Sequence, residues 1–184
     1  VAAKLHAEWK GREAVRSIAF QYDGNAGHLG GVHEKHFYRD PDGQRWLFKP
    51  DKKGGGAVAA AEEAAAEIAR RVGLPSVEVR QVNLDGRVGS VQRMLAGASP
   101  LPGDPAEWTP EQRQGVMMHH VVDWLIGDHD GNAGNFILAD GAPVRIDRGQ
   151  AFKFLGKDKL DLHYEPNKHH GAPPHAALLL YRAA

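Results

Sequence analysis

One segment in the C-terminal half constrains the fold of this chain more than any other. An apolar run over residues 121–126 leads into a polar, glycine-rich loop, which ends at the short apolar run 136–138. Asp130 lies near the start of the loop and Asn135 lies at its end. The pattern predicts a helix, a tight loop and a short buried strand, with Asp130 and Asn135 flanking the loop.

A β-hairpin is predicted directly after that loop. Asp140-Gly141 is a strong signal for a tight turn, and residues 144–146 are typical of the returning strand. This strand leads into the sequence Asp147-Arg-Gly. Because the two strands of a hairpin lie side by side, we expect Asp147 beside Asn135.

Three polar residues of this region suit phosphoryl transfer. The reaction needs a carboxylate that orients or deprotonates the acceptor, together with oxygen ligands for Mg²⁺, which prefers carboxylate and amide oxygens. Asp130, Asn135 and Asp147 supply that set. The alternative is that they are ordinary turn residues, since Asp, Asn and Gly dominate turns for reasons of backbone geometry alone.

The N-terminal half contains a glycine-rich segment followed by a predicted hairpin. The segment 23–31 ends in Gly30 and Gly31, and a Pro41-Asp-Gly turn separates two aromatic-rich runs, the second of which ends at Lys49. Glycines let backbone amides approach anionic oxygens closely. We expect a phosphate-covering loop joined to a lysine that reaches the phosphates. The alternative is a flexible entry loop and an exposed lysine.

An alanine-rich helix is predicted over residues 58–72. Helical spacing puts Glu62 on the apolar stripe that runs from one end of this helix to the other, so Glu62 is the candidate partner for Lys49. Glu63 is one position further around the helix and stays open as an alternative. Glu67 is expected on the solvated surface.

The domain organisation that follows is an α+β fold of two lobes. Residues 1–95 form an N-terminal lobe with an antiparallel sheet and the alanine-rich helix. Residues 96–106 are rich in turn-forming residues and are predicted to be a hinge or linker. Residues 107–184 form a small, mostly helical C-terminal lobe, whose first helix starts at Thr109-Pro110 with Gln112 as the capping partner.

Composition excludes several classes of function. Lys plus Arg equals Asp plus Glu at 23 each, so the chain has no excess of positive charge for nucleic acid. Cysteine is absent, which excludes disulfides and thiolate chemistry. No apolar run reaches the length of about 20 residues that spans a bilayer, so we expect a soluble protein, either cytoplasmic or delivered into a target cytoplasm. The start at Val1 predicts a domain of a longer chain or a processed product.

The order of these motifs resembles the protein-kinase-like superfamily. The resemblance covers about residues 24–152. Within the superfamily the chain looks most like the atypical branch that holds type II phosphatidylinositol 4-kinases, HipA-type kinases and compact bacterial effector kinases. The catalytic loop of that branch reads Asp, four residues, Asn, as in Asp130 to Asn135, and its metal motif resembles Ile146-Asp-Arg-Gly.

The resemblance implies a role for each matching residue. Lys49 would contact the α- and β-phosphates of ATP and pair with Glu62, and Gly30 and Gly31 would belong to the phosphate-covering loop. Backbone groups of Gln92, Arg93 and Met94 would hydrogen-bond the adenine. Asp130 would be the catalytic carboxylate, and Asn135 and Asp147 would bind Mg²⁺, or Mn²⁺ in its place.

The chain also departs from the pattern of that branch. Arg or a second Asp often follows the catalytic Asp there, and His comes next, whereas this chain has Gly131-Asn132, with His129 in front of Asp130. The segment after Phe152, residues 153–184, contains no substrate-docking segment of the usual kind, so the C-terminal lobe would be minimal or truncated.

The leading hypothesis is an ATP-dependent kinase that acts on a protein hydroxyl, since no amphipathic basic helix is found to hold a lipid surface. A phosphatidylinositol or small-molecule kinase, an AMP transferase with the nucleotide reversed, and a pseudokinase that binds nucleotide without turnover stay open as alternatives.

Overall fold

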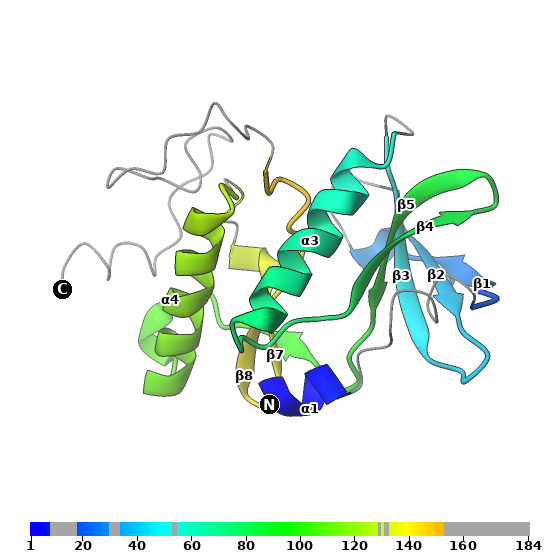
Figure 1. The fold of residues 1–184 in the computed structure, drawn as a ribbon. Coiled ribbons are helices and arrows are strands. Elements are labelled where there is room, and N and C mark those ends of the chain that lie inside the picture. The colour runs from blue at the N-terminus through cyan, green and yellow to red at the C-terminus, as the bar shows by residue number, and fades with distance from the viewer. Residues whose placement is uncertain (8–17, 30–33, 53–54, 129, 131–132, 153–184) are drawn as a thin grey trace.

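The computed structural model describes residues 1–7, 18–29, 34–52, 55–128, 130 and 133–152 (Figure 1). The helices are α1 (Ala2–Ala7), η1 (Gly27–Leu29), α3 (Ala57–Arg71), η2 (Pro105–Glu107), α4 (Pro110–Leu125) and η3 (Ala133–Asn135). The strands are β1 (Gln21–Asn25), β2 (His36–Arg39), β3 (Arg45–Pro50), β4 (Val79–Leu84), β5 (Arg87–Arg93), β6 (Ser99–Pro100), β7 (Phe136–Ala139) and β8 (Ala142–Arg145). They form the predicted α+β fold of two lobes.

The N-terminal lobe is an antiparallel sheet of five strands in the order β1-β2-β3-β5-β4, with α3 packed against β4 and β5 (Figure 1). The hairpins predicted at Pro41-Asp-Gly and at Asp140-Gly141 are both present, and β4 and β5 form a further hairpin. The β4–β5 turn at Asp85-Gly86 has φ values of 53° and 78°, and the β7–β8 turn at Asp140-Gly141 has 49° and 79°. Positive φ at both central residues is typical of the type I′ turn that matches strand twist.

The two faces of this sheet differ in chemistry. One face carries an aromatic cluster with Tyr38, Trp46, Phe48, Val82 and Val91. Because side chains alternate along a strand, Leu47 and Lys49 lie on the opposite face, which α3 partly covers. The sheet therefore separates a mainly aromatic layer from a layer that carries the charge of Lys49.

Helix α3 agrees with the predicted helix to within one residue at each end. Glu62, Ala65 and Ala69 are buried along one side of it. Val58 and Val72, predicted on the same apolar stripe, are 47% and 55% exposed, so that prediction is wrong at the helix ends. The buried stripe spans only the middle turns, where the helix packs on the sheet and on α4.

Helix α4 starts as predicted. The Thr109 hydroxyl accepts the Gln112 N–H at 3.2 Å, and the Gln112 side chain accepts the Thr109 N–H at 3.0 Å, which completes a capping box. The segment predicted as a linker, 96–106, contains β6 and the start of η2. Strand β6 pairs with β7, so the C-terminal sheet has the order β6-β7-β8.

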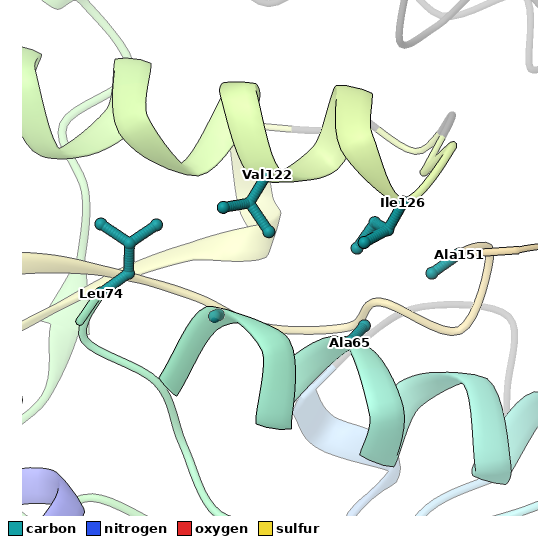
Figure 2. Packing of buried hydrophobic residues seen from close by; sticks show 6 residues of the cluster. Ala65, Leu74, Val122, Ile126 and Ala151 are labelled. Atoms are coloured by element: carbon teal, nitrogen blue, oxygen red, sulfur yellow. The ribbon is translucent and has the colours of Figure 1, made fainter. Parts of the chain in front are cut away.

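A shared hydrophobic core joins the two lobes. Its side chains come from α3 and the turn after it, from α4 and its C-cap, and from the segment after β8, and Figure 2 shows them pointing toward one another between the two helices. The buried members are Ala65, Ala69, Leu74, Val122, Ile126 and Ala151. The chain just beyond Asp147 is therefore held between α3 and α4. None of the helices in the described ranges combines the length and apolar character that a bilayer crossing needs.

Candidate active site

The centre of the candidate site is Lys49, near the end of β3. Its ammonium donates to the carboxylate of Glu62 on α3, and it lies 3.2 Å from Oδ1 of Asp147, which follows β8. The side chains of Lys49 and Glu62 are 11% and 4% exposed, whereas that of Asp147 is 40% exposed. The predicted pairing of Lys49 with Glu62 is present, and Asp147 leaves one side of the cluster open.

Strand β5 supports this cluster from the neighbouring position in the sheet. Ser90 lies directly opposite Lys49, and its hydroxyl donates to Oε2 of Glu62 at 2.6 Å. The preceding residue, Gly89, lies opposite Pro50, where an added Cβ would come within 2.4 Å of the Lys49 carbonyl oxygen. The absence of a side chain at Gly89 lets β5 approach β3 closely beside the lysine.

Opposing effects set the charge state of the cluster. Burial would lower the pKa of Lys49, but the carboxylates of Glu62 and Asp147 outweigh it and raise that pKa above its ordinary value. Burial would raise the pKa of Asp147, but the Lys49 charge and hydrogen bond lower it below its ordinary value. Lys49 is therefore a cation and Asp147 an anion at neutral pH.

The three glutamates of α3 have different partners in the structure. Glu63 is buried but accepts the backbone N–H of Gln81 at 2.9 Å, so Glu62 is the partner of Lys49. Glu67 forms ion pairs with Arg70 and Arg71, but its side chain is only 20% exposed, so it is less solvated than predicted.

The loop that carries Asp147 is tightly packed. Asp147 has φ of 57°, a left-handed conformation that Asp tolerates better than most residues. A Cβ on Gly149 would lie 2.9 Å from the Val58 side chain, so this segment passes close to the start of α3. The Ile146 N–H donates to the Asn135 carbonyl at 2.8 Å, which puts Asn135 beside the Asp147 segment as predicted.

Asp130 follows α4, and its backbone is held on both sides. Its N–H donates to Oδ1 of Asp128 at 3.0 Å, and its carbonyl accepts from the guanidinium of Arg145. Gly30 and Gly31, predicted to belong to the phosphate-covering loop, lie outside the described residues, as do His129, Gly131 and Asn132 around Asp130. For Asp130 itself, the structure establishes backbone contacts to Asp128 and Arg145.

Sequence reasoning missed a buried network of charges behind this loop. The carboxylate of Asp123 on α4 pairs with two arginines. The Nε of Arg145 lies 3.2 Å from one of its oxygens, and the Nε of Arg148 lies 3.2 Å from the other. Arg148 also donates to Nδ1 of His119 at 2.9 Å, and Arg145 lies 3.5 Å from Asp128. Asp123, Arg145 and Arg148 are each at most 2% exposed. The network joins α4 to the residues on either side of Asp147.

A signal for the network is visible in the sequence. Asp123 interrupts the apolar run 121–126, and Arg145 stands between the apolar residues of a short strand. Charged residues are almost never fully buried unless they are paired. An acidic residue in one apolar run and a basic residue in another would have been grounds to predict a buried ion pair between them.

Backbone groups of the residues predicted to bind adenine mostly form hydrogen bonds with neighbouring segments of the N-terminal lobe. The Met94 N–H donates to the Arg45 carbonyl at 2.9 Å, and the Met94 carbonyl accepts from the Gln44 side chain at 2.9 Å. The Arg93 N–H donates to the Glu78 carbonyl at 2.9 Å. Gln92 lies within β5, paired with Leu47 on β3. The N–H groups of Arg93 and Met94 are thus not available to a base in this arrangement.

Oxygen donors near Asp147 suit a hard divalent cation. Carboxylate oxygens of Asp147 and the amide oxygen of Asn135 are of the type that Mg²⁺ prefers. The amide nitrogen of Asn135 is buried and has no hydrogen-bond partner among the described residues. The described ranges gather no set of three or more acidic or histidine side chains as a closed metal site.

Comparison with known proteins supports the fold. The crystal structure of the Helicobacter pylori proinflammatory kinase CtkA matches with a TM-score of 0.50 and 14% sequence identity, over 66% of this chain and 55% of that kinase. This chain thus spans about half of that kinase's length. No protein-family model matches, and a search of curated proteins found no match. The chain has a minimal kinase-like fold.

Proposed function

We propose that the chain is an ATP-dependent phosphotransferase that acts on a hydroxyl group. The observation that carries this proposal is the position of Lys49 between buried Glu62 and half-exposed Asp147. A buried lysine held by a helix carboxylate presents a fixed positive charge. A partly open carboxylate beside it can share a divalent cation with phosphate oxygens.

Asn135 and Asp147 are the residues that would hold Mg²⁺, or Mn²⁺ in its place. When bound there, the cation neutralises charge on the phosphates of the nucleotide. Lys49 would contact the α- and β-phosphates, and Glu62 fixes its direction. Phosphoryl transfer depends mainly on such positioning and charge neutralisation.

Asp130 would orient the acceptor and receive its proton. The acceptor oxygen forms a bond to the γ-phosphorus as the bond from that phosphorus to the bridging β–γ oxygen breaks. ADP leaves with the electrons of that bond, and the hydroxyl proton passes to the Asp130 carboxylate. Contacts of the Asp130 backbone with Asp128 and Arg145 hold the loop for this role.

The adenine would lie on the apolar part of the same sheet face. Ala26, Phe37 and Leu47 form a cluster there with the Met94 side chain. Because the N–H groups of Arg93 and Met94 are used within the sheet, we assign the hydrogen bonds to adenine to the backbone just after Met94, at Leu95 and Ala96. The Gln92–Met94 segment would then contribute the Met94 side chain as a contact surface.

The experiment is incubation of the purified chain with γ-labelled ATP and Mg²⁺, alone and with cell lysate, beside Asp130→Ala and Asp147→Ala. A kinase transfers label to itself or to a lysate protein, and both variants lose the transfer. The proposed acceptor is a protein hydroxyl, which a labelled protein band supports and a labelled lipid or small molecule contradicts. Nucleotide binding without transfer under all conditions would indicate a pseudokinase.

Intact mass of the labelled product separates the kinase from the AMP transferase. The added group weighs about 80 Da for a phosphoryl group and about 329 Da for AMP. The kinase proposal requires the smaller increment.

A further inference from the structure

Lys49 belongs to a row of three residues that crosses the sheet on the side of α3. Ser90 on β5 is paired with Lys49 on β3 at one side and with Gln81 on β4 at the other. Side chains of directly opposite residues project from the same face of a sheet. That face is the one toward α3, because Lys49 and Ser90 both donate to Glu62. The row therefore meets α3 at the turn that carries Glu62.

The outer residue of the row holds the backbone of α3. The Gln81 N–H donates to Oε2 of Glu63 at 2.9 Å, and the Gln81 side-chain amide donates to the Gly56 carbonyl at 3.1 Å, just before α3 begins. A Cβ on Gly56 would lie 2.3 Å from that amide nitrogen, so helix and strand approach each other closely there. Since the helix is held at its start and at Glu63, the main freedom left to Glu62 is rotation of its side chain.

Ser90 restricts that rotation. The Glu62 side chain is 4% exposed, and its two carboxylate oxygens have different donors. Oε1 accepts from the Lys49 ammonium, and Oε2 accepts the hydroxyl of buried Ser90 at 2.6 Å. Because a hydroxyl on a strand holds Oε2, the plane of the carboxylate is set and Oε1 points at Lys49.

Lys49 depends on this arrangement because its second carboxylate partner is open to other ligands. Oδ1 of Asp147 lies 3.2 Å from the ammonium, and in the proposed function the Asp147 side chain, 40% exposed, turns to a divalent cation. Glu62 is then the carboxylate that keeps Lys49 in place. A displacement of about 1 Å in a positioned group can lower a reaction rate about a hundredfold.

We propose that Ser90 is a positioning residue for phosphoryl transfer, which orients the Glu62 carboxylate and through it directs the Lys49 ammonium toward the α- and β-phosphates. This inference rests on the proposed function. It gives a role in the reaction to a side chain that contacts neither the nucleotide nor the metal.

The test is the initial rate of label transfer at several concentrations of γ-labelled ATP with Mg²⁺, for variants that differ in the hydroxyl. Ser90→Ala removes the hydroxyl and is expected to lower kcat/KM for ATP about tenfold, the effect of losing a hydrogen bond to a charged group. Ser90→Thr and Ser90→Val add side chains of equal size, and only the first keeps a hydroxyl. Crowding affects both, so a higher kcat/KM in Ser90→Thr than in Ser90→Val isolates the hydrogen bond.

Ser76→Ala is the matched control for the loss of a buried hydroxyl. Ser76 is 1% exposed, and its hydroxyl donates to the Ala66 carbonyl on α3 at 3.1 Å, away from the Lys49 cluster. Ser76→Ala also loses a buried hydrogen bond to α3, but its kcat/KM should match that of the wild type. Urea denaturation of every variant identifies a loss of fold.

A double-mutant cycle with Glu62→Gln separates positioning from a general effect on the fold. Glu62→Gln removes the charge that Ser90 orients, so Ser90→Ala should have no further effect on kcat/KM in that background. A second loss equal to the one in the wild-type background means that Ser90 does not act through Glu62, and this result overturns the proposal.

The outcomes distinguish this inference from the proposed function. Wild-type protein that transfers no label overturns both. Wild-type protein that transfers label, together with a Ser90→Ala variant that equals it or falls no further than Ser76→Ala, overturns the role of Ser90 alone. If Ser90→Ala does not fold, equal kcat/KM values for Ser90→Thr and Ser90→Val overturn that role.

Discussion

The molecule has two groups of paired charges near the β8 segment, one that includes Asp147 and one centred on Asp123, and their side chains differ in exposure. The Lys49 cluster has one cation between two carboxylates, and its Asp147 side chain is 40% exposed. The Asp123 network places two arginines on one carboxylate, and all three side chains are at most 2% exposed. The first group is open to a ligand, whereas the second is closed by protein.

Because of this difference in exposure, we expect one group to bind ligand and the other to stabilise the fold. An open ion pair can exchange a protein partner for a phosphate or a metal, so its charges are available to a substrate. A closed network cannot, and its charges instead hold backbone: Arg145 and Arg148 flank Asp147, and Arg145 also holds the Asp130 carbonyl. We expect substitutions in the first group to affect activity and substitutions in the second to affect stability.

The largest expected effect breaks the closed network. Asp123→Ala removes the carboxylate that two buried guanidinium groups share and leaves Arg145 with Asp128 at 3.5 Å, and removing one partner of a buried pair typically costs about 3–5 kcal/mol. The free energy of unfolding from urea denaturation measures it. Glu34→Ala, which removes an exposed carboxylate paired with Arg87, is the control and should cost far less. Equal costs for the two variants would mean that Asp123 is not the anchor of the network.

The open cluster should show the reverse pattern. Asp147→Asn is expected to lower phosphoryl transfer by about a thousandfold, since it removes a charge from the reaction centre. Lys49 keeps its pairing with Glu62, so the free energy of unfolding should change by less than about 1 kcal/mol. Initial rates with labelled ATP and a parallel urea denaturation give both numbers. A variant that unfolds as readily as Asp123→Ala would contradict the division between the two groups.

The pH dependence of stability sharpens the comparison further. Burial, followed by the charge of Arg148, lowers the pKa of His119 from 6.5 to about 3. The folded state thus holds His119 neutral, and its contribution is full above pH 6.5 and is lost as the pH falls toward 3. This loss amounts to about 2 kcal/mol between pH 6.5 and pH 5.

His119→Gln should remove that part of the acid sensitivity. The glutamine keeps an acceptor for Arg148 and a donor for the Pro143 carbonyl, but it does not titrate. Unfolding free energies of both proteins at several pH values provide the measurement. If the two curves stay parallel from pH 6.5 to pH 5, the protonation of His119 is not linked to folding.

The smallest expected effect concerns neither group of charges. Thr109→Ala removes the capping box at the start of α4, far along the helix from Asp123, and should cost about 1 kcal/mol. Thr109→Ser keeps the hydroxyl and should restore most of that stability. Thermal unfolding of the three proteins tests this, and a cost as large as that of Asp123→Ala would mean that capping, rather than the network, limits the stability of this lobe.

Short-range features of the fold were predictable because their causes lie close together in the chain. The turns at Asp85-Gly86 and Asp140-Gly141 follow from residues that tolerate positive φ, and the start of α4 follows from Thr109 and Gln112. Helix α3 follows from its alanines. The pairing of Lys49 with Glu62 was predictable from helical spacing once a strand and a helix were placed in order.

Long-range features were predicted less well. The Lys49–Asp147 contact joins positions 98 residues apart, and the Arg145–Asp123 pair joins a strand to a helix across 22 residues. The prediction that backbone groups at 92–94 face adenine did not account for the Arg45, Gln44 and Glu78 partners, which come from neighbouring segments of the N-terminal lobe.

The elements, their order and the residue types that suit phosphate chemistry can be read from the amino-acid sequence, since propensity, capping and turn conformation depend on neighbours along the chain. Which charges are open and which are buried follows instead from the three-dimensional packing. Burial and ion pairing depend on the packing of α3, α4 and the β8 segment against one another, and the energy of a charge depends on its surroundings in space. Asp123 and Asp147 are the same amino acid, and their different surroundings give one a structural role and the other a place in the candidate active site.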